Sequence, residues 1–127
     1  MILGSGIDLI EIQRIQQSLD RYGHRFLNRV YTPAEQDFCL RKRNSAESLA
    51  ARFAAKEAAA KALGTGISRG VSWLEIEVLR ERGYRPTLRF HGRALQIATH
   101  MGVVHTALSL THSLQIAMAS VTLEDDR

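Results

Sequence analysis

Hydrophobic and polar positions follow different periods along the chain, and the changes between them mark the predicted elements. Residues 2–9 combine four aliphatic side chains with two glycines, which predicts a short buried strand. The segment from Leu9 to about Tyr22 has apolar side chains at the spacing of a helix face. These apolar positions are Ile12, Ile15 and Leu19. The chain is therefore predicted to begin with a strand that leads into an amphipathic helix.

Two further helices are predicted from their start and stop signals. The tetrapeptide Thr-Pro-Ala-Glu at 32–35 offers a capping threonine, a proline at the first helical position and a glutamate three residues after the cap. That helix should run to about Arg41. Asn44 or Ser45 can cap the next helix, whose alanine-rich sequence ESLAARFAAKEAAAKAL has high intrinsic helix propensity. Gly64 is well placed to end it in a left-handed conformation.

The second half of the chain is dominated by the two-residue alternation of strands. The predicted elements are strands at 73–80 and 87–90, a turn at 83–86, a helix at 92–101, and strands at about 105–111 and 116–123. This mixed order predicts an α+β fold, a single domain over residues 1–127 with a largely antiparallel sheet packed with helices.

Composition narrows the class of protein. The chain has 127 residues, about one domain, and its 45% apolar and 24% charged residues are typical of a soluble globular protein. No apolar run approaches the roughly 20 residues that span a bilayer, and the start lacks the basic region of a secretory signal. Cys39 is the single cysteine, which excludes an internal disulfide. We therefore expect a cytoplasmic protein with no membrane partner.

Two clusters of polar residues are candidates for chemistry. Asp8 ends the apolar segment Gly-Ile-Asp-Leu, and a carboxylate there needs a metal, an arginine or a helix N-terminus as its partner. Glu57 and Lys61 lie one turn apart on the alanine-rich helix, where a simple exposed ion pair is the plain alternative. Alanines flank Glu57, so another element can approach closely, and a glycine-rich loop follows at 64–66. A carboxylate, a lysine and such a loop suit a pyrophosphate whose charge is shared by a metal and the lysine.

A third cluster is the segment Leu-Ser-Leu-Thr-His-Ser at 108–113, which places hydroxyls and an imidazole at the end of an alternating strand. A Ser–His nucleophile pair is disfavoured, because neighbours on a strand face opposite ways and no nucleophile elbow is present. A phosphate or ribose contact by His112 is the favoured interpretation, and a locally paired histidine at a turn is the alternative. The histidines do not form a zinc-binding pattern.

Taken in order, the three clusters resemble the 4'-phosphopantetheinyl transferase superfamily, and most closely its small bacterial branch, the holo-acyl-carrier-protein synthases. The matching stretches are GIDLIEIQRI at 6–15, RFAAKEAAAKALGTGI at 52–67 and LSLTHSLQIAMASV at 108–121. The resemblance covers nearly the whole chain. It implies Mg²⁺-dependent transfer of 4'-phosphopantetheine from coenzyme A to a serine of apo acyl carrier protein, with release of adenosine 3',5'-bisphosphate.

The resemblance also implies roles for individual residues. Asp8 and Glu57 match the acidic pair that binds Mg²⁺, and Lys61 matches the lysine that approaches the phosphates, so Glu57 and Lys61 are the predicted catalytic residues. Glu57 itself and a water molecule both stay open as the base. The predicted coenzyme A contacts are Lys61, Gly64, Thr111 and His112. The predicted docking residues for acyl carrier protein are Arg14, Arg21 and Arg25. The family further implies a homotrimer with active sites between neighbouring subunits.

Two other interpretations follow from the residues alone. The net charge of +4 favours an anionic partner, so a non-enzymatic nucleic-acid-binding domain is possible. Such a domain should present aromatic platforms among its cations, whereas Phe53, Trp73 and Phe90 stand in apolar surroundings and are predicted to be core, so no nucleic acid is expected. A structural oligomer that packs through the alanine-rich helix is the other possibility. The sequence leaves open whether the carrier serves fatty-acid or polyketide synthesis.

Overall fold

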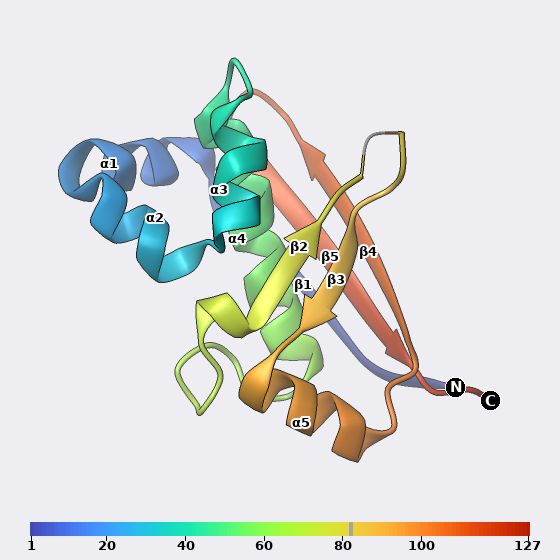
Figure 1. Ribbon diagram of the computed structural model, residues 1–127. Coiled ribbons are helices and arrows are strands. Elements are labelled where there is room, and N and C mark those ends of the chain that lie inside the picture. The colour runs from blue at the N-terminus through green and yellow to red at the C-terminus, as the bar shows by residue number, and fades with distance from the viewer. Residues whose placement is uncertain (82) are drawn as a thin grey trace.

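The longest helix of the chain, α4, lies at the centre of the fold between two antiparallel sheets (Figure 1). The computed structural model describes residues 1–81 and 83–127. The elements in chain order are β1 (Ile2–Glu11), α1 (Ile12–Tyr22), α2 (His24–Val30), α3 (Pro33–Leu40), α4 (Ser45–Ala62), the 3-10 helix η1 (Trp73–Glu75), β2 (Ile76–Leu79), β3 (Thr87–Phe90), α5 (Gly92–Met101), β4 (His105–His112) and β5 (Ile116–Glu124). The predicted α+β class is confirmed.

The strands in the described part of the chain form two sheets and not one. The three-stranded sheet has the order β1-β5-β4, and β2 pairs with β3 in the separate two-stranded sheet. In the larger sheet, Asp8 pairs with Ala119, which pairs with Leu110 on its other side. Ala119 is buried on the face that packs against α4. Because directly paired residues share a face, Asp8 lies on the α4 side of the sheet.

Local signals explain the helix ends that the sequence predicted. The Thr32 hydroxyl accepts a hydrogen bond from the Glu35 amide at 3.3 Å, and the Thr32 amide donates to Glu35 Oε1 at 2.8 Å, which completes a capping box. Asn44 caps α4 by accepting from the Glu47 amide at 3.3 Å. Gly64 follows α4 with a φ of +83°, the left-handed conformation expected there.

Other boundaries differ from the prediction for identifiable reasons. Strand β1 continues to Glu11, because its last residues pair with the start of β5, so helix α1 begins at Ile12 and not near residue 9. Helix α2 was not predicted; Gly23, with a φ of +53°, separates it from α1. Residues 73–75 form η1 instead of strand, because Glu75 closes a capping box at this point. None of the helices within the described residues combines the length and apolar character needed to cross a membrane.

Candidate active site

The contact between β1 and α4 brings two backbones together without intervening side chains. A Cβ atom added at Gly6 would overlap the carbonyl oxygen of Ala58, and one added at Gly4 would overlap that of Ala62. Both alanines are buried, so the partners on the helix are as small as a side chain allows. This close approach explains the two glycines in the first strand and the alanines of α4. Asp8 follows Gly6 by two positions, and therefore lies on the same face, beside the helix.

Asp8, Glu57 and Lys61 come together at this contact. The Lys61 ammonium lies 2.9 Å from Asp8 Oδ1 and donates a hydrogen bond of 3.1 Å to the Ile7 carbonyl. Within residues 1–81 and 83–127, Lys61 forms its ion pair with Asp8 across the contact and not with Glu57 on its own helix. Partial burial and the negative charge of Asp8 raise the pKa of Glu57, while the Lys61 charge acts in the opposite direction. Two carboxylates and one ammonium thus share a small volume.

This arrangement fits a magnesium ion that is partly coordinated by a substrate. Asp8 and Glu57 supply carboxylate oxygens, the ligands that Mg²⁺ prefers. Within the described part of the chain, no group of three or more His, Cys, Asp or Glu side chains could hold a metal by itself. Mg²⁺ typically uses one or two carboxylates together with substrate phosphates and water, whereas structural zinc sites need four protein ligands. The donor set therefore fits Mg²⁺ shared with a phosphate group.

His112 lies near the other end of α4. Its Nε2 atom is 3.1 Å from Glu47 Oε1, in the first turn of the helix. Glu47 and Glu57 are ten residues apart, which is about 15 Å along a helix axis. His112 is therefore not beside the two carboxylates of its own chain. Thr111 precedes His112 on β4, faces the opposite side of the sheet and is exposed.

A basic pocket surrounds His112, with a volume of about 910 Å³. The cationic side chains that line it are Arg41, Lys42, Arg43, Arg52 and Arg80, besides His112. Glu47 and Glu81 are its acidic lining residues. The excess of positive charge suits a ligand with several negative charges, such as a phosphorylated molecule.

Arg52 is one of the cationic pocket residues that the sequence did not predict, and it is the most buried of them. It is only 3% exposed, and its guanidinium lies 4.3 Å from the centre of the Phe38 ring. Its Nη1 atom donates to Ser48 Oγ at 3.2 Å, whereas its Nε atom has no hydrogen-bond partner among the described residues. A largely buried cation that lines a pocket favours an anionic ligand there, because little water screens its charge. The available signal was an arginine within the alanine-rich, buried part of α4.

The other predicted residues lie as follows. Gly64 follows α4 at the Lys61 end, so it belongs to the same region as the carboxylate pair. Arg14 and Arg21 are exposed on α1, and Arg25 is exposed on α2. One end of α4 therefore holds Asp8, Glu57, Lys61 and Gly64, and the other end holds His112.

Comparison with known proteins places this geometry in a family. A model of the 4'-phosphopantetheinyl transferase superfamily matches residues 4–119. The chain belongs to this superfamily. It is 57% identical over 125 residues to the holo-[acyl-carrier-protein] synthase of Koribacter versatilis, covering 98% of this chain and 100% of that relative. The enzyme of the same name from Solibacter usitatus is 50% identical over 125 residues, with the same coverage.

Solved structures of this superfamily share the fold. A holo-(acyl-carrier-protein) synthase from Bacillus anthracis, in complex with coenzyme A (3',5'-ADP), is 38% identical and superposes with a TM-score of 0.82 over 99% of both chains. The holo-[acyl-carrier-protein] synthase of Neisseria meningitidis is 33% identical, with a TM-score of 0.88 over 98% of this chain and 100% of that one. The resemblance inferred from the sequence is confirmed at the level of family and fold.

Proposed function

We propose that this protein is a holo-acyl-carrier-protein synthase that transfers 4'-phosphopantetheine from coenzyme A to a serine of apo acyl carrier protein. The observation that carries the proposal is the group of Asp8, Glu57 and Lys61 at the contact of β1 with α4, where the Lys61 ammonium lies 2.9 Å from Asp8. Relatives that bear this enzyme name match essentially the full chain at up to 57% identity. Adenosine 3',5'-bisphosphate is the second product in this proposal.

Asp8 and Glu57 are the proposed ligands of Mg²⁺. When bound, Mg²⁺ would act as a Lewis acid on the pyrophosphate of coenzyme A. The attacking hydroxyl belongs to the carrier protein, so the chain needs no nucleophile of its own. The Lys61 ammonium neutralises charge on the departing phosphate, which is the main electrostatic demand of phosphoryl transfer. Glu57 and a water molecule are the two candidates for the base that accepts the serine proton.

The basic pocket around His112 is the proposed site for the anionic end of coenzyme A. Arg52 supports this role, because its largely buried guanidinium contributes a poorly screened positive charge to the lining of the pocket. The Bacillus anthracis relative was solved with coenzyme A (3',5'-ADP), a ligand with several phosphates. Since the pocket and the carboxylate pair lie at opposite ends of α4, we propose that one coenzyme A uses the carboxylates of one subunit and the pocket of the next.

A homotrimer with shared sites is part of the same proposal. The face of the three-stranded sheet that points away from α4 exposes Ile7 and Leu9, at 58% and 57%. The neighbouring side chains on that face are Thr111 and Met118, paired across β4 and β5. Exposed aliphatic side chains on a regular sheet face are typical of a subunit interface. In such an assembly Thr111 of this chain would lie at the subunit boundary, where the proposed coenzyme A contacts meet.

Acyl carrier protein is the proposed protein partner, with Arg14, Arg21 and Arg25 as the docking residues. All three are exposed on adjacent helices, so their charges can face an acidic surface. A cytoplasmic location belongs to the proposal as well. Nucleic-acid binding is disfavoured, because Phe53 and Trp73 pack on each other at 4.5 Å between ring centroids and lie against the core instead of forming a platform for bases.

Mass spectrometry of apo carrier protein tests the proposed activity. Incubation with this chain, coenzyme A and Mg²⁺ should add the mass of one phosphopantetheine. Asp8→Asn and Glu57→Gln, which keep the size of each side chain, should lower the rate at least about a hundredfold, because each removes a charged ligand of the metal. Circular dichroism checks that both variants are folded. Normal turnover by either variant in magnesium buffer would refute the metal assignment.

Mixing two inactive variants tests whether the site is shared between subunits. Glu57→Gln damages the carboxylate end, and Arg52→Met damages the basic pocket. If each site joins the two ends from neighbouring subunits, co-expression of both variants in equal amounts should restore roughly a quarter of the wild-type activity, since that fraction of interfaces combines two intact halves. Mixtures of Glu57→Gln with Asp8→Asn should stay inactive, because both changes fall on the same half. No recovery in the first mixture would exclude the shared site.

A further inference from the structure

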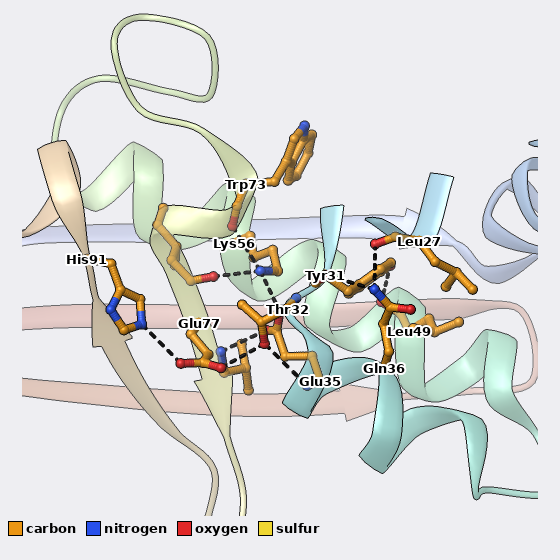
Figure 2. A network of polar contacts seen from close by, with 12 residues as sticks. Leu27, Tyr31, Thr32, Glu35, Gln36, Leu49, Lys56, Trp73, Glu77 and His91 are labelled. Carbon is orange, nitrogen blue, oxygen red and sulfur yellow. Dashed lines mark hydrogen bonds and ion pairs between the residues drawn. The ribbon is translucent and has the colours of Figure 1, made fainter. Parts of the chain in front are cut away.

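The residue that precedes Glu57 is Lys56, a fully buried lysine whose ammonium group is paired in the interior. The Lys56 ammonium lies 2.8 Å from Glu35 Oε1 and donates to the carbonyls of Trp73 at 2.9 Å and Ile76 at 2.6 Å (Figure 2). An ammonium has three N–H donors, so these three oxygens match its full set. Lys56 and Glu35 are both fully buried side chains. Lys56 therefore has a different role from Lys61, one turn and a residue further along the same helix.

Glu35 extends this contact to two other elements. Its Oε1 atom accepts from the Thr32 amide at 2.8 Å at the start of α3, and its Oε2 atom accepts from the Val78 amide at 2.8 Å in β2. The pair of Glu35 and Lys56 thus joins α3, α4 and β2 at one point. Because each polar atom has a partner, the pair can hold a defined geometry in the interior.

The opposite face of α4 is held less firmly, because its polar link to β1 is the partly exposed Lys61–Asp8 pair with the hydrogen bond from Lys61 to the Ile7 carbonyl. Lys56 and Ala58 are two residues apart, which is about 200° around a helix, so they point in nearly opposite directions. On the Ala58 side the helix meets the Gly4 and Gly6 backbone of β1, where no side chain from the strand inserts into the helix surface. A smooth contact of this kind resists rotation of the helix about its axis less than interdigitated side chains do.

We propose that Lys56 and Glu35 are positioning residues, which fix the rotation of α4 so that Glu57 faces Asp8. Side-chain groups lie about 5–6 Å from a helix axis, so a rotation of about 10° moves the Glu57 carboxylate by about 1 Å. A displacement of about 1 Å at a reacting centre costs about a hundredfold in rate. The inference rests on the proposed assignment of Asp8 and Glu57 to the metal site.

The test uses the double variant Glu35→Gln/Lys56→Met. Removing both charges avoids an unpaired buried ion, and glutamine keeps an oxygen for the capping box. The readouts are thermal unfolding, binding of Mn²⁺ in the presence of coenzyme A by electron paramagnetic resonance, and kcat. The folded double variant should bind Mn²⁺ about 10–100-fold more weakly, the range found when supporting contacts of metal ligands are lost. Its kcat should fall about a hundredfold and recover in part at high Mg²⁺.

One control separates positioning from a general loss of stability. Ile15→Val removes a methyl group from a buried residue of α1 outside the Glu35–Lys56 pair, and should lower stability while leaving Mn²⁺ affinity unchanged. A loss of Mn²⁺ affinity in Ile15→Val equal to that of the double variant would overturn the inference. So would a folded double variant with wild-type Mn²⁺ affinity and kcat. If the double variant does not fold, Glu35→Asp, which keeps both charges and shortens one side chain, is compared in the same way and must show weaker Mn²⁺ binding.

Glu57→Gln distinguishes failure of the metal assignment from failure of the positioning role. If Glu57→Gln binds Mn²⁺ as the wild type does, the metal site itself is wrongly assigned, and the inference falls with it. If Glu57→Gln loses Mn²⁺ binding while the double variant retains it, the metal assignment stands and the positioning role alone is refuted.

Discussion

Replacement of Gly6 by alanine adds one methyl group where β1 lies directly on α4. The new Cβ would stand 2.9 Å from the carbonyl carbon of Ala58 and 3.0 Å from the amide nitrogen of Ala62. Carbon atoms in contact prefer about 3.5–4.0 Å, and the overlap of the new Cβ with the carbonyl oxygen of Ala58 is deeper still, so strand and helix must separate by more than about 1 Å. Both neighbours are backbone atoms, which cannot rotate away. Since Asp8 follows on the same strand, it would move away from Glu57 by a similar amount.

The expected effects are a loss of stability and a larger loss of activity. Overpacking of this kind costs about 1–3 kcal/mol in free energy of unfolding. A displacement of about 1 Å or more between two proposed metal ligands should lower kcat/KM by about a hundredfold. Urea unfolding measures the first quantity, and the initial rate of carrier-protein modification at saturating Mg²⁺ measures the second.

Gly102→Ala is the matched control. Gly102 ends α5 with a φ of +89°, and an added Cβ would meet no atom within 4 Å. The same chemical change there costs about 1 kcal/mol of backbone strain without crowding α4. Its activity should equal that of the wild type at a temperature where both are folded. Full activity in Gly6→Ala would show that the distance between β1 and α4 does not set the geometry of the site.

Two further predictions concern other parts of the molecule. Arg14→Glu should raise the KM for carrier protein about tenfold while leaving the KM for coenzyme A unchanged, because reversing a charge at a docking surface acts mainly on the acidic partner. Steady-state kinetics with each substrate varied in turn measures both constants. An unchanged KM for carrier protein would contradict the proposed docking surface. Burial tends to raise the pKa of Glu77, but the hydrogen bonds from Thr32 and His91, with the charges of His91 and Arg89, outweigh it and hold the pKa below its ordinary value. Because the pKa of Glu77 is lower in the folded than in the unfolded protein, its ionised carboxylate stabilises the fold above the unfolded pKa of about 4.3, and this stabilisation is lost as the pH falls through the folded pKa. The Tm of Glu77→Gln should therefore depend less on pH in that acidic range than the Tm of the wild type.

Structural features that depend only on residues close together in the sequence could be predicted. The capping box at Thr32 and the left-handed Gly64 are fixed by local backbone chemistry, and both are confirmed. The alanines of α4 indicated that another element could approach this helix closely, although not which element. Family resemblance then gave the fold and the class of enzyme.

Features that depend on tertiary packing could not be predicted. Lys56 and Lys61 stand on the same helix in similar alanine-rich surroundings, yet the fold buries the first and leaves the second half exposed beside Asp8. The exposure of the two lysines differs because sheets lie on both sides of α4. The periodicity of a helix sequence does not show where such sheets will pack. Arg52 and the basic pocket were missed for the same reason, since the pocket is assembled from α3, α4, the segment after β2, and β4.

Pairing of β1 with β5 has a consequence for how the molecule folds. Gly6 pairs with Val121, so the strand that carries Asp8 finds its neighbour in the sheet almost a whole chain length away. Contacts between residues so distant in sequence slow folding, because a large loop must close before they form. During synthesis, α4 can form early from its own propensity, but Asp8 has no sheet to hold it until β5 has been made. The carboxylate pair is therefore among the last parts of the native structure to form, and among the first to be lost when the outer strands separate.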